Sequence, residues 1–157
     1  MRSVLEAAVR EFTAEEHIRN VLEGAWVPLH DEDGKELEGI RGRMGAVAVG
    51  MMDHEIGVDC IEMQPGAAFA LHVHPGDHIL YILEGIGLVH VDGNDHHVRP
   101  GDSVFIPAEK AHGVKTYKPP HDKRFLFLAF GHPHKHVEAT DRMTLVREDE
   151  DENGKDI

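Results

Sequence analysis

Three histidines lie within seven residues of one stretch of this chain: His72, His74 and His78. Because residues two apart on an extended strand point to the same face, His72 and His74 are predicted to aim their imidazoles at one point. The turn sequence Pro75-Gly76-Asp77 separates them from His78, which is expected to begin the next strand and to approach the same point. Three neutral imidazoles that converge inside an apolar frame are typical of a metal site.

A fourth histidine follows a second segment of turns and strands, Gly101 to Val114. Gly101 opens a turn, and Ser103 to Ile106 is predicted to form a short strand that ends at Pro107. His112 follows on the next strand. His112 is therefore the candidate fourth ligand.

The two segments resemble the two motifs of the cupin superfamily. The first motif of that family runs Pro-Gly, His-any-His, Glu and Gly, and at matching spacings this chain has Pro65-Gly66, His72-Val73-His74, His78 and Gly85. The second motif runs Gly, Pro-any-Gly, His and Asn, and here the positions are Gly101, Pro107, Glu109, His112 and Thr116. The chain departs from the family pattern at three positions: His78 replaces Glu, Glu109 replaces Gly, and Thr116 replaces Asn.

The resemblance covers roughly residues 45 to 130 and implies an all-β fold, the jelly-roll β-barrel or double-stranded β-helix, with a metal held inside by both motifs. A chain of 157 residues supports one domain. We expect an N-terminal helical and extended arm over 1–44, the barrel over 45–136, and an acidic disordered tail over 137–157. Helical spacing in Ser3–Phe12, and a capping box at Thr13 and Glu16, predict two short N-terminal helices.

The formal net charge of −13 argues against nucleic acid as a partner. No stretch approaches the ~20 apolar residues of a membrane span, and the start of the chain lacks the apolar run of a secretory signal. We therefore expect a cytoplasmic protein with no membrane partner. The single cysteine, Cys60, excludes an internal disulfide framework.

Strand alternation also predicts which side chains surround the site. In the two ligand strands, Ala70 shares a face with His72 and His74, and Leu80 and Ile82 share a face with His78. Phe125 and Phe127, in the last clear strand, are expected to line the barrel as well. The opposite face of the second ligand strand carries the apolar residues Ile79, Tyr81 and Leu83. We expect a homodimer that packs this sheet face or the N-terminal segment against its mate; the alternative is a monomer whose own N-terminal residues cover the sheet.

The remaining histidines are expected to lie in loops or on the surface: His54, His90, His96 and His97. His132, His134 and His136 are interpreted as an exposed exit loop, with a second functional site as the alternative.

The predicted cofactor is one divalent transition metal. Imidazole suits Fe, Mn, Ni, Cu and Zn; Fe or Mn is favoured here, with Ni, Zn and Cu as alternatives. With Glu in the family position, one ligand would be anionic, whereas four histidines leave the full charge of the metal uncompensated. We therefore expect a small-molecule substrate that is anionic or enolisable and bidentate.

The resemblance implies a metal-dependent dioxygenase that cleaves a C–C bond in a diketone-like, hydroxyketone or phenolic substrate. The same scaffold also hosts isomerases, lyases and polyketide cyclases, in which the metal serves as a Lewis acid. A non-catalytic small-molecule-binding protein is the third alternative. Glu62, Glu84 and Glu109 are candidate bases, but the sequence identifies no catalytic residue.

Overall fold

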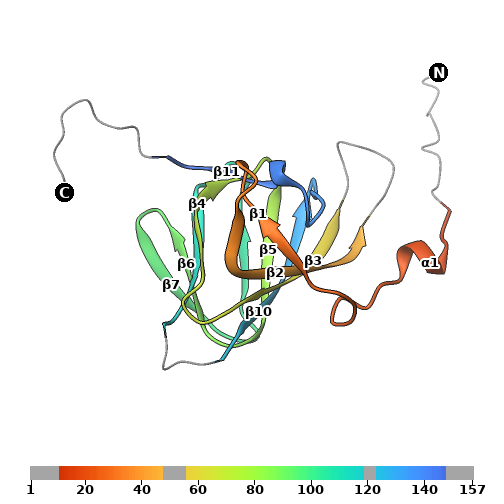
Figure 1. Cartoon of the computed structure of the whole chain (residues 1–157), viewed down its shortest axis with the longest axis horizontal. Coiled ribbons are helices and arrows are strands. Elements are labelled where there is room, and N and C mark those ends of the chain that lie inside the picture. Colours follow the sequence, from red (N-terminus) through yellow and green to blue (C-terminus); the bar gives the residue numbers. More distant parts are fainter. Residues whose placement is uncertain (1–10, 48–55, 119–122, 148–157) are drawn as a thin grey trace, which may run out of the picture.

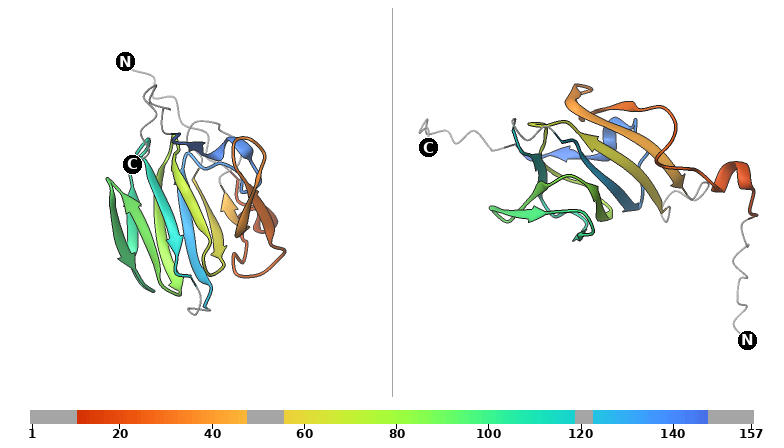
Figure 2. Two further views of the ribbon diagram at one scale, coloured as in Figure 1. Left: turned by 60° about the vertical axis from the view of Figure 1, so that its left-hand side comes forward. Right: turned by 90° about the horizontal axis from the view of Figure 1, so that it is seen from below.

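The computed structural model describes residues 11–47, 56–118 and 123–147. Two antiparallel sheets, which face each other, make up most of this part of the chain (Figure 1). Figure 2 shows the same two layers from the side and from below. The predicted all-β barrel of the jelly-roll type is confirmed.

The larger sheet has six strands in the order β1-β2-β3-β10-β5-β8. Their bounds are Val27–His30 for β1, Glu36–Val47 for β2, Gly57–Met63 for β3, Phe125–His132 for β10, Asp77–Glu84 for β5 and Ser103–Ile106 for β8. The central strand, β10, pairs with β3 on one side and with β5 on the other, so segments far apart in sequence lie side by side.

The smaller sheet has five strands in the order β11-β4-β9-β6-β7. They are β11, Thr144–Leu145; β4, Ala68–Val73; β9, His112–Thr116; β6, Gly87–Val91; and β7, Asn94–Val98. A short 3-10 helix, η1, spans Thr140–Arg142 just before β11. Strands β1 and most of β2 precede residue 45 and β11 follows residue 136, so the two sheets extend beyond the predicted barrel range of 45–136.

The core lies between the sheets and follows the two-residue period of the strands. In β3, Ile61 and Met63 point inward, and in β5, Leu80 and Ile82 do so. Residues from nearly every other strand join the same cluster: Leu29, Ile40, Val89, Val98, Ile106, Val114, Phe125, Phe127 and Ala129. This interior provides the apolar frame that the sequence predicts around the histidines.

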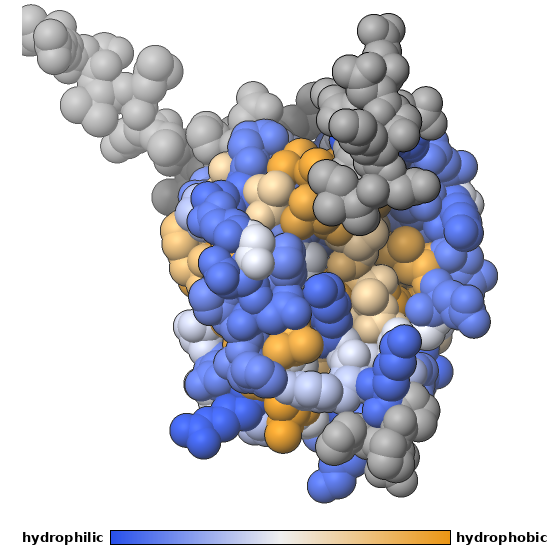
Figure 3. Space-filling view, turned by 90° about the vertical axis from the view of Figure 1, so that its left-hand side faces the viewer, coloured by the Kyte–Doolittle hydropathy of each residue, from blue (hydrophilic) through white to orange (hydrophobic). Residues whose placement is uncertain are grey.

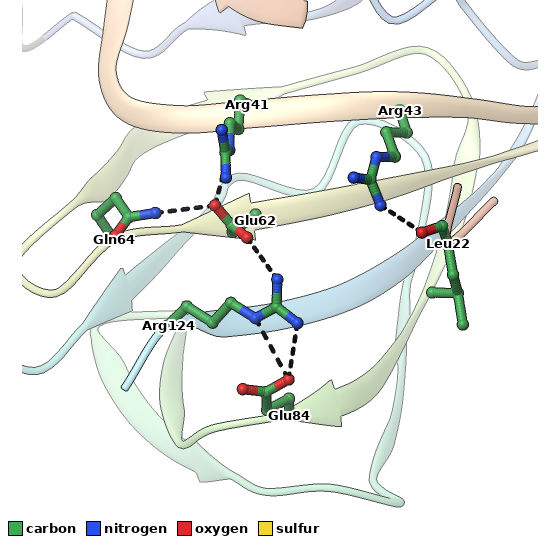
Figure 4. Close-up of polar contacts among 7 residues, drawn as sticks. All are labelled: Leu22, Arg41, Arg43, Glu62, Gln64, Glu84 and Arg124. Carbon is green, nitrogen blue, oxygen red and sulfur yellow. Dashed lines mark hydrogen bonds and ion pairs between the residues drawn. The ribbon is translucent and has the colours of Figure 1, made fainter. Parts of the chain in front are cut away.

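The outer face of β3 carries a buried carboxylate. Glu62 is 1% exposed and accepts hydrogen bonds from Arg41, Gln64 and Arg124, while Arg124 also reaches Glu84 (Figure 4). Although burial opposes ionisation, the hydrogen bonds and charges of the two arginines hold the pKa of Glu62 below its usual value. Arg41 belongs to β2, Glu62 to β3 and Glu84 to β5, and Arg124, just before β10, contacts both carboxylates. The network therefore joins β2, β3 and β5 across the outside of the sheet.

The second of the two expected N-terminal helices is shorter than the sequence predicts. Helix α1 spans only Ala14–His17, and Thr13, at its N-cap, makes no side-chain capping hydrogen bond. Most of the other expected helix falls outside the described residues. Because a single turn buries little apolar surface, tertiary contacts hold the segment that follows. Arg43 donates a hydrogen bond to the carbonyl of Leu22 (Figure 4). Its guanidinium group also lies over the ring of Trp26.

The surface is mainly hydrophilic in the view of Figure 3, where hydrophobic residues gather in a band between hydrophilic ones. Within the described part of the chain, no helix has the length and apolar character needed to cross a membrane.

Candidate metal centre

Three buried histidines converge between the two sheets. Ligand nitrogens of His72, His74 and His112 all lie within 4.8 Å of one another. His72 and His112 face each other across the β4–β9 pair, with ring centroids 4.3 Å apart, and His74 follows directly after β4. Residues from two different sequence motifs therefore meet because their strands are neighbours.

A β-bulge turns His72 toward the interior. Phe69 pairs with Val114 and His72 pairs with His112. Between these two pairs β4 advances by three residues and β9 by only two, so β4 contains one extra residue. Without the extra residue, Phe69 and His72 would point to opposite faces of β4. With the bulge, both side chains line the same cavity.

Backbone carbonyls orient two of the imidazoles. The Nδ1 atom of His72 is 2.7 Å from the carbonyl oxygen of Ala70, and that of His112 is 2.9 Å from the carbonyl oxygen of Lys110. Because a carbonyl oxygen can only accept a hydrogen bond, Nδ1 carries the proton in each ring. Nε2 is then unprotonated and has a free lone pair. This is the tautomer that binds a metal through Nε2.

The cavity keeps its histidines neutral. Burial, followed by the influence of His112, lowers the pKa of His72 to about 3. Burial and the nearby His78 lower the pKa of His74 to about 3, and burial and Arg142 do the same for His78. Burial also lowers the pKa of His112, against the opposing effect of the Lys110 carbonyl. At neutral pH all four rings are therefore available as ligands.

His78 lies beside the group of three. It comes from β5 in the opposite sheet, lines the same cavity, and stacks on His74 with ring centroids 3.7 Å apart. Its nitrogens are not part of the cluster within 4.8 Å that the described residues form. Its role as the fourth ligand stays a prediction.

The structure places the five predicted pocket-lining residues in three different environments. Leu80 and Phe127 line the cavity, whereas Ile82 and Phe125 lie deeper in the core. Ala70 is exposed, because the bulge in β4 interrupts the alternation on which its prediction depends. Phe69 lines the cavity in its place.

Several cavity residues were not singled out from the sequence: Ile61, Val114, Ala129, Arg142 and Met143. Arg142 and Met143 follow the last long strand, in a region where no sequence pattern indicates a site. Outside this lining, Asp59 was also missed, although it is 1% exposed and shares the inward face of β3 with Ile61 and Met63. A charged residue at an inward position of an apolar strand is a signal that could have identified it.

The other histidines divide between surface and interior. His96 and His97 are exposed and His90 is half-buried. His134 departs from the expected exposed loop, because its side chain is 5% exposed and its Nε2 lies 3.0 Å from a carboxylate oxygen of Asp59. His54 lies outside the described residues.

None of the three candidate bases lines the cavity. Glu62 points to the outer face of the sheet, Glu84 pairs there with Arg124, and Glu109 is exposed. Glu109 has a φ of 60°, in the left-handed region that favours the glycine of the family motif. Its backbone N–H donates to the carbonyl of His74, so its position affects the backbone of the site rather than the chemistry.

Comparison with known proteins points to one family. The family profile described as a cupin domain matches residues 60–129. The solved structure of KdgF from a Halomonas species superposes with a TM-score of 0.58 at 23% identity, and covers 76% of this chain and 94% of that one. At this identity the likeness concerns the fold alone.

Two curated relatives match shorter segments. An oxalate-binding protein of Thermotoga maritima is 34% identical over 57 residues, which are 36% of this chain and 47% of the relative. The dimethylsulfoniopropionate lyase DddW of Ruegeria pomeroyi is 35% identical over 66 residues, which are 42% of each chain. The matched segments thus span less than half the length of these relatives.

We expect the metal-free protein to lose stability as the pH falls below about 6.5, where histidines of an unfolded chain titrate. In the fold, His72, His74 and His78 stay neutral down to about 3. As the pH falls, protons therefore bind the unfolded chain before they bind the folded protein. The contribution of these histidines to the free energy of unfolding is fully present above about pH 6.5 and is lost progressively toward pH 3. The slope is about 1.4 kcal/mol per pH unit for each such histidine.

Urea denaturation between about pH 7.5 and pH 5 measures this slope, above the range in which carboxylates titrate. The control is His96→Ala, which removes an exposed histidine and should keep the slope. A free energy of unfolding that is constant over this pH range would contradict the burial of neutral histidines.

Proposed function

Because the chain belongs to the cupin superfamily, we propose that it binds one divalent transition metal through His72, His74, His78 and His112 and acts on a small anionic or enolisable molecule. The observation that carries this proposal is the cluster of three buried imidazoles whose ligand nitrogens lie within 4.8 Å of one another. The donor set fits such a metal, because the rings are neutral and two of them hold their free Nε2 in place through carbonyl contacts. Iron or manganese is the favoured ion.

The chain's own residues determine how a substrate meets that metal. The imidazoles would hold the ion, and apolar side chains of both sheets, Phe69, Leu80 and Phe127, line the cavity around them. When bound, the metal would supply a Lewis acid and, if iron or manganese, a redox centre for reactions with dioxygen. Since all its ligands are neutral, its positive charge favours a substrate that binds as an anion.

We propose dioxygenase chemistry on an enolisable or phenolic substrate as the first specific reaction. The second is a lyase, isomerase or cyclase reaction without dioxygen, which the 35% identity to a dimethylsulfoniopropionate lyase favours. The third is binding without turnover, which the 34% identity to an oxalate-binding protein favours. Each of these similarities covers only part of the relative.

We expect single alanine substitutions of His72, His74, His78 and His112 each to lower the metal content of the purified protein, since each removes one ligand. Elemental analysis after anaerobic reloading with Fe(II) or Mn(II) measures the occupancy. His96→Ala is the control and should retain the metal, because this side chain is exposed on β7. If any two of the four variants keep full occupancy, the four-ligand proposal is wrong.

The reaction class can be tested with the metal-loaded protein and a panel of diketones and phenols. We expect dioxygen consumption that depends on both metal and substrate. Loss of dimethylsulfoniopropionate without dioxygen consumption would favour the lyase instead. Calorimetric binding of oxalate with no turnover of any compound would favour the non-catalytic alternative.

We also propose that the protein is a homodimer that uses the outer face of the larger sheet. Ile79, Tyr81 and Phe105 are exposed by 43%, 41% and 60%, and Ile79 is paired with Phe105 across β5 and β8. The half-buried Leu128 and Phe130 continue this surface on β10. An exposed apolar patch over three adjacent strands favours association, and two-fold pairs are the commonest assembly.

Light scattering should give about twice the 17.5 kDa chain mass at micromolar concentration. We expect Phe105→Glu to shift the protein to monomers, because it places a charge in the apolar patch. The matched control is Ile86→Glu, which adds the same charge at a residue that is 56% exposed outside the patch. A wild-type mass near that of one chain would contradict the dimer.

A further inference from the structure

An arginine from outside the matched cupin segment lies in the histidine cavity. Arg142 ends helix η1, beyond the matched residues 60–129, and its side chain is only 13% exposed. It lines the cavity together with the four histidines. Its charge is close enough to affect the protonation of His72, His74 and His78.

The contacts of Arg142 leave much of its guanidinium group unused. Nη1 donates a hydrogen bond of 3.2 Å to the carbonyl of Val137, and Nη2 lies 3.7 Å from Oδ2 of Asp59. A guanidinium group has five N–H donors. Among the described residues, the only hydrogen bond that it makes is the one to Val137. The remaining donors are available to a ligand in the cavity.

Asp59 is the charged partner of Arg142, and it is shared with His134. Its Oδ2 is also 3.0 Å from Nε2 of His134, and its Oδ1, though buried, has no hydrogen-bond partner among the described residues. Arg142 and Asp59 carry opposite charges, so together they leave the charge of a divalent metal held by neutral histidines uncompensated. A ligand with negative charge would restore the balance in a cavity of low polarity.

We propose that Arg142 binds the carboxylate of a small organic acid, whose neighbouring oxygen faces the histidines and their metal. The proposal rests on the proposed function, because it assigns the substrate class of that same site. A guanidinium fork matches a carboxylate with two parallel hydrogen bonds, which a lysine does not provide. The free space beside the histidines, about 40 Å³, has room for only a few non-hydrogen atoms, so the acid is small.

A purely structural role would give Arg142 a different signature. It would hold the segment around η1 against the barrel through Val137 and Asp59. Loss of either charged partner would then have similar effects. If Arg142 binds the substrate, loss of Asp59 has the opposite effect to loss of Arg142, because Asp59 competes with the carboxylate for the guanidinium and repels it.

The test uses the full-length protein loaded with Co(II), and titrates it calorimetrically with glycolate and with glycolamide, a neutral compound of similar shape. Metal content is measured first for every variant. We expect Arg142→Gln to weaken glycolate binding about tenfold to a hundredfold, which corresponds to the loss of hydrogen bonds to a charged group. Glycolamide affinity should change little, Arg142→Lys should lie in between, and Asp59→Asn should strengthen glycolate binding.

The outcomes separate this inference from the proposed function. A wild-type protein that takes up no metal would overturn the metal function and this inference with it. A metal-loaded wild type whose preference for glycolate over glycolamide is the same in Arg142→Gln would overturn the inference alone. If Arg142→Gln does not fold, Asp59→Asn decides: weaker glycolate binding in this variant would contradict the carboxylate site and support the structural role.

Discussion

The site depends on one cross-strand pair, His72 of β4 against His112 of β9. Their strands belong to different sequence motifs, and only the sheet brings them together. The bulge before His72 gives the pair its inward direction, since it adds one residue to β4 just where the strand must turn a polar side chain toward an apolar core. His74, two residues further on, lies with His72 in the same cavity.

A cluster of imidazoles is tolerated between two apolar sheets because the rings stay uncharged. Burial disfavours their protonation, and carbonyls of Ala70 and Lys110 accept the Nδ1 protons that would otherwise remain unpaired. Among the described residues, no carboxylate lines this cavity. Glu62 is equally buried, but strand alternation sends it to the outer face of β3, where Arg41 and Arg124 neutralise it.

Sequence reasoning was most successful where the information is local. Two gapped motifs identify the fold and single out His72, His74 and His112, which strand pairing then brings into one cavity. Strict alternation then fails at Ala70, because a bulge is a property of the paired strands and leaves no mark in one strand alone. The same alternation rule could have identified Asp59, which shares the inward face of β3 with Ile61 and Met63. It could not have identified Arg142, because the place of this residue in the cavity depends on how the chain returns after β10 to pair β11 with β4.

The position of Arg142 bears on how charge is distributed over this fold. A carboxylate ligand in the position of His78 would compensate part of the metal's charge from within the motif itself. With His78 there, the four candidate ligands of the cupin segment are all neutral. The charged groups beside the site lie outside the matched residues 60–129: Asp59 directly before them and Arg142 after them. Because these two residues oppose each other, neither the motif nor its surroundings neutralise a divalent ion. In the proposed metal-bound state, a substrate would then be the main source of negative charge, and its binding would depend on the metal and on the segment after β10 together.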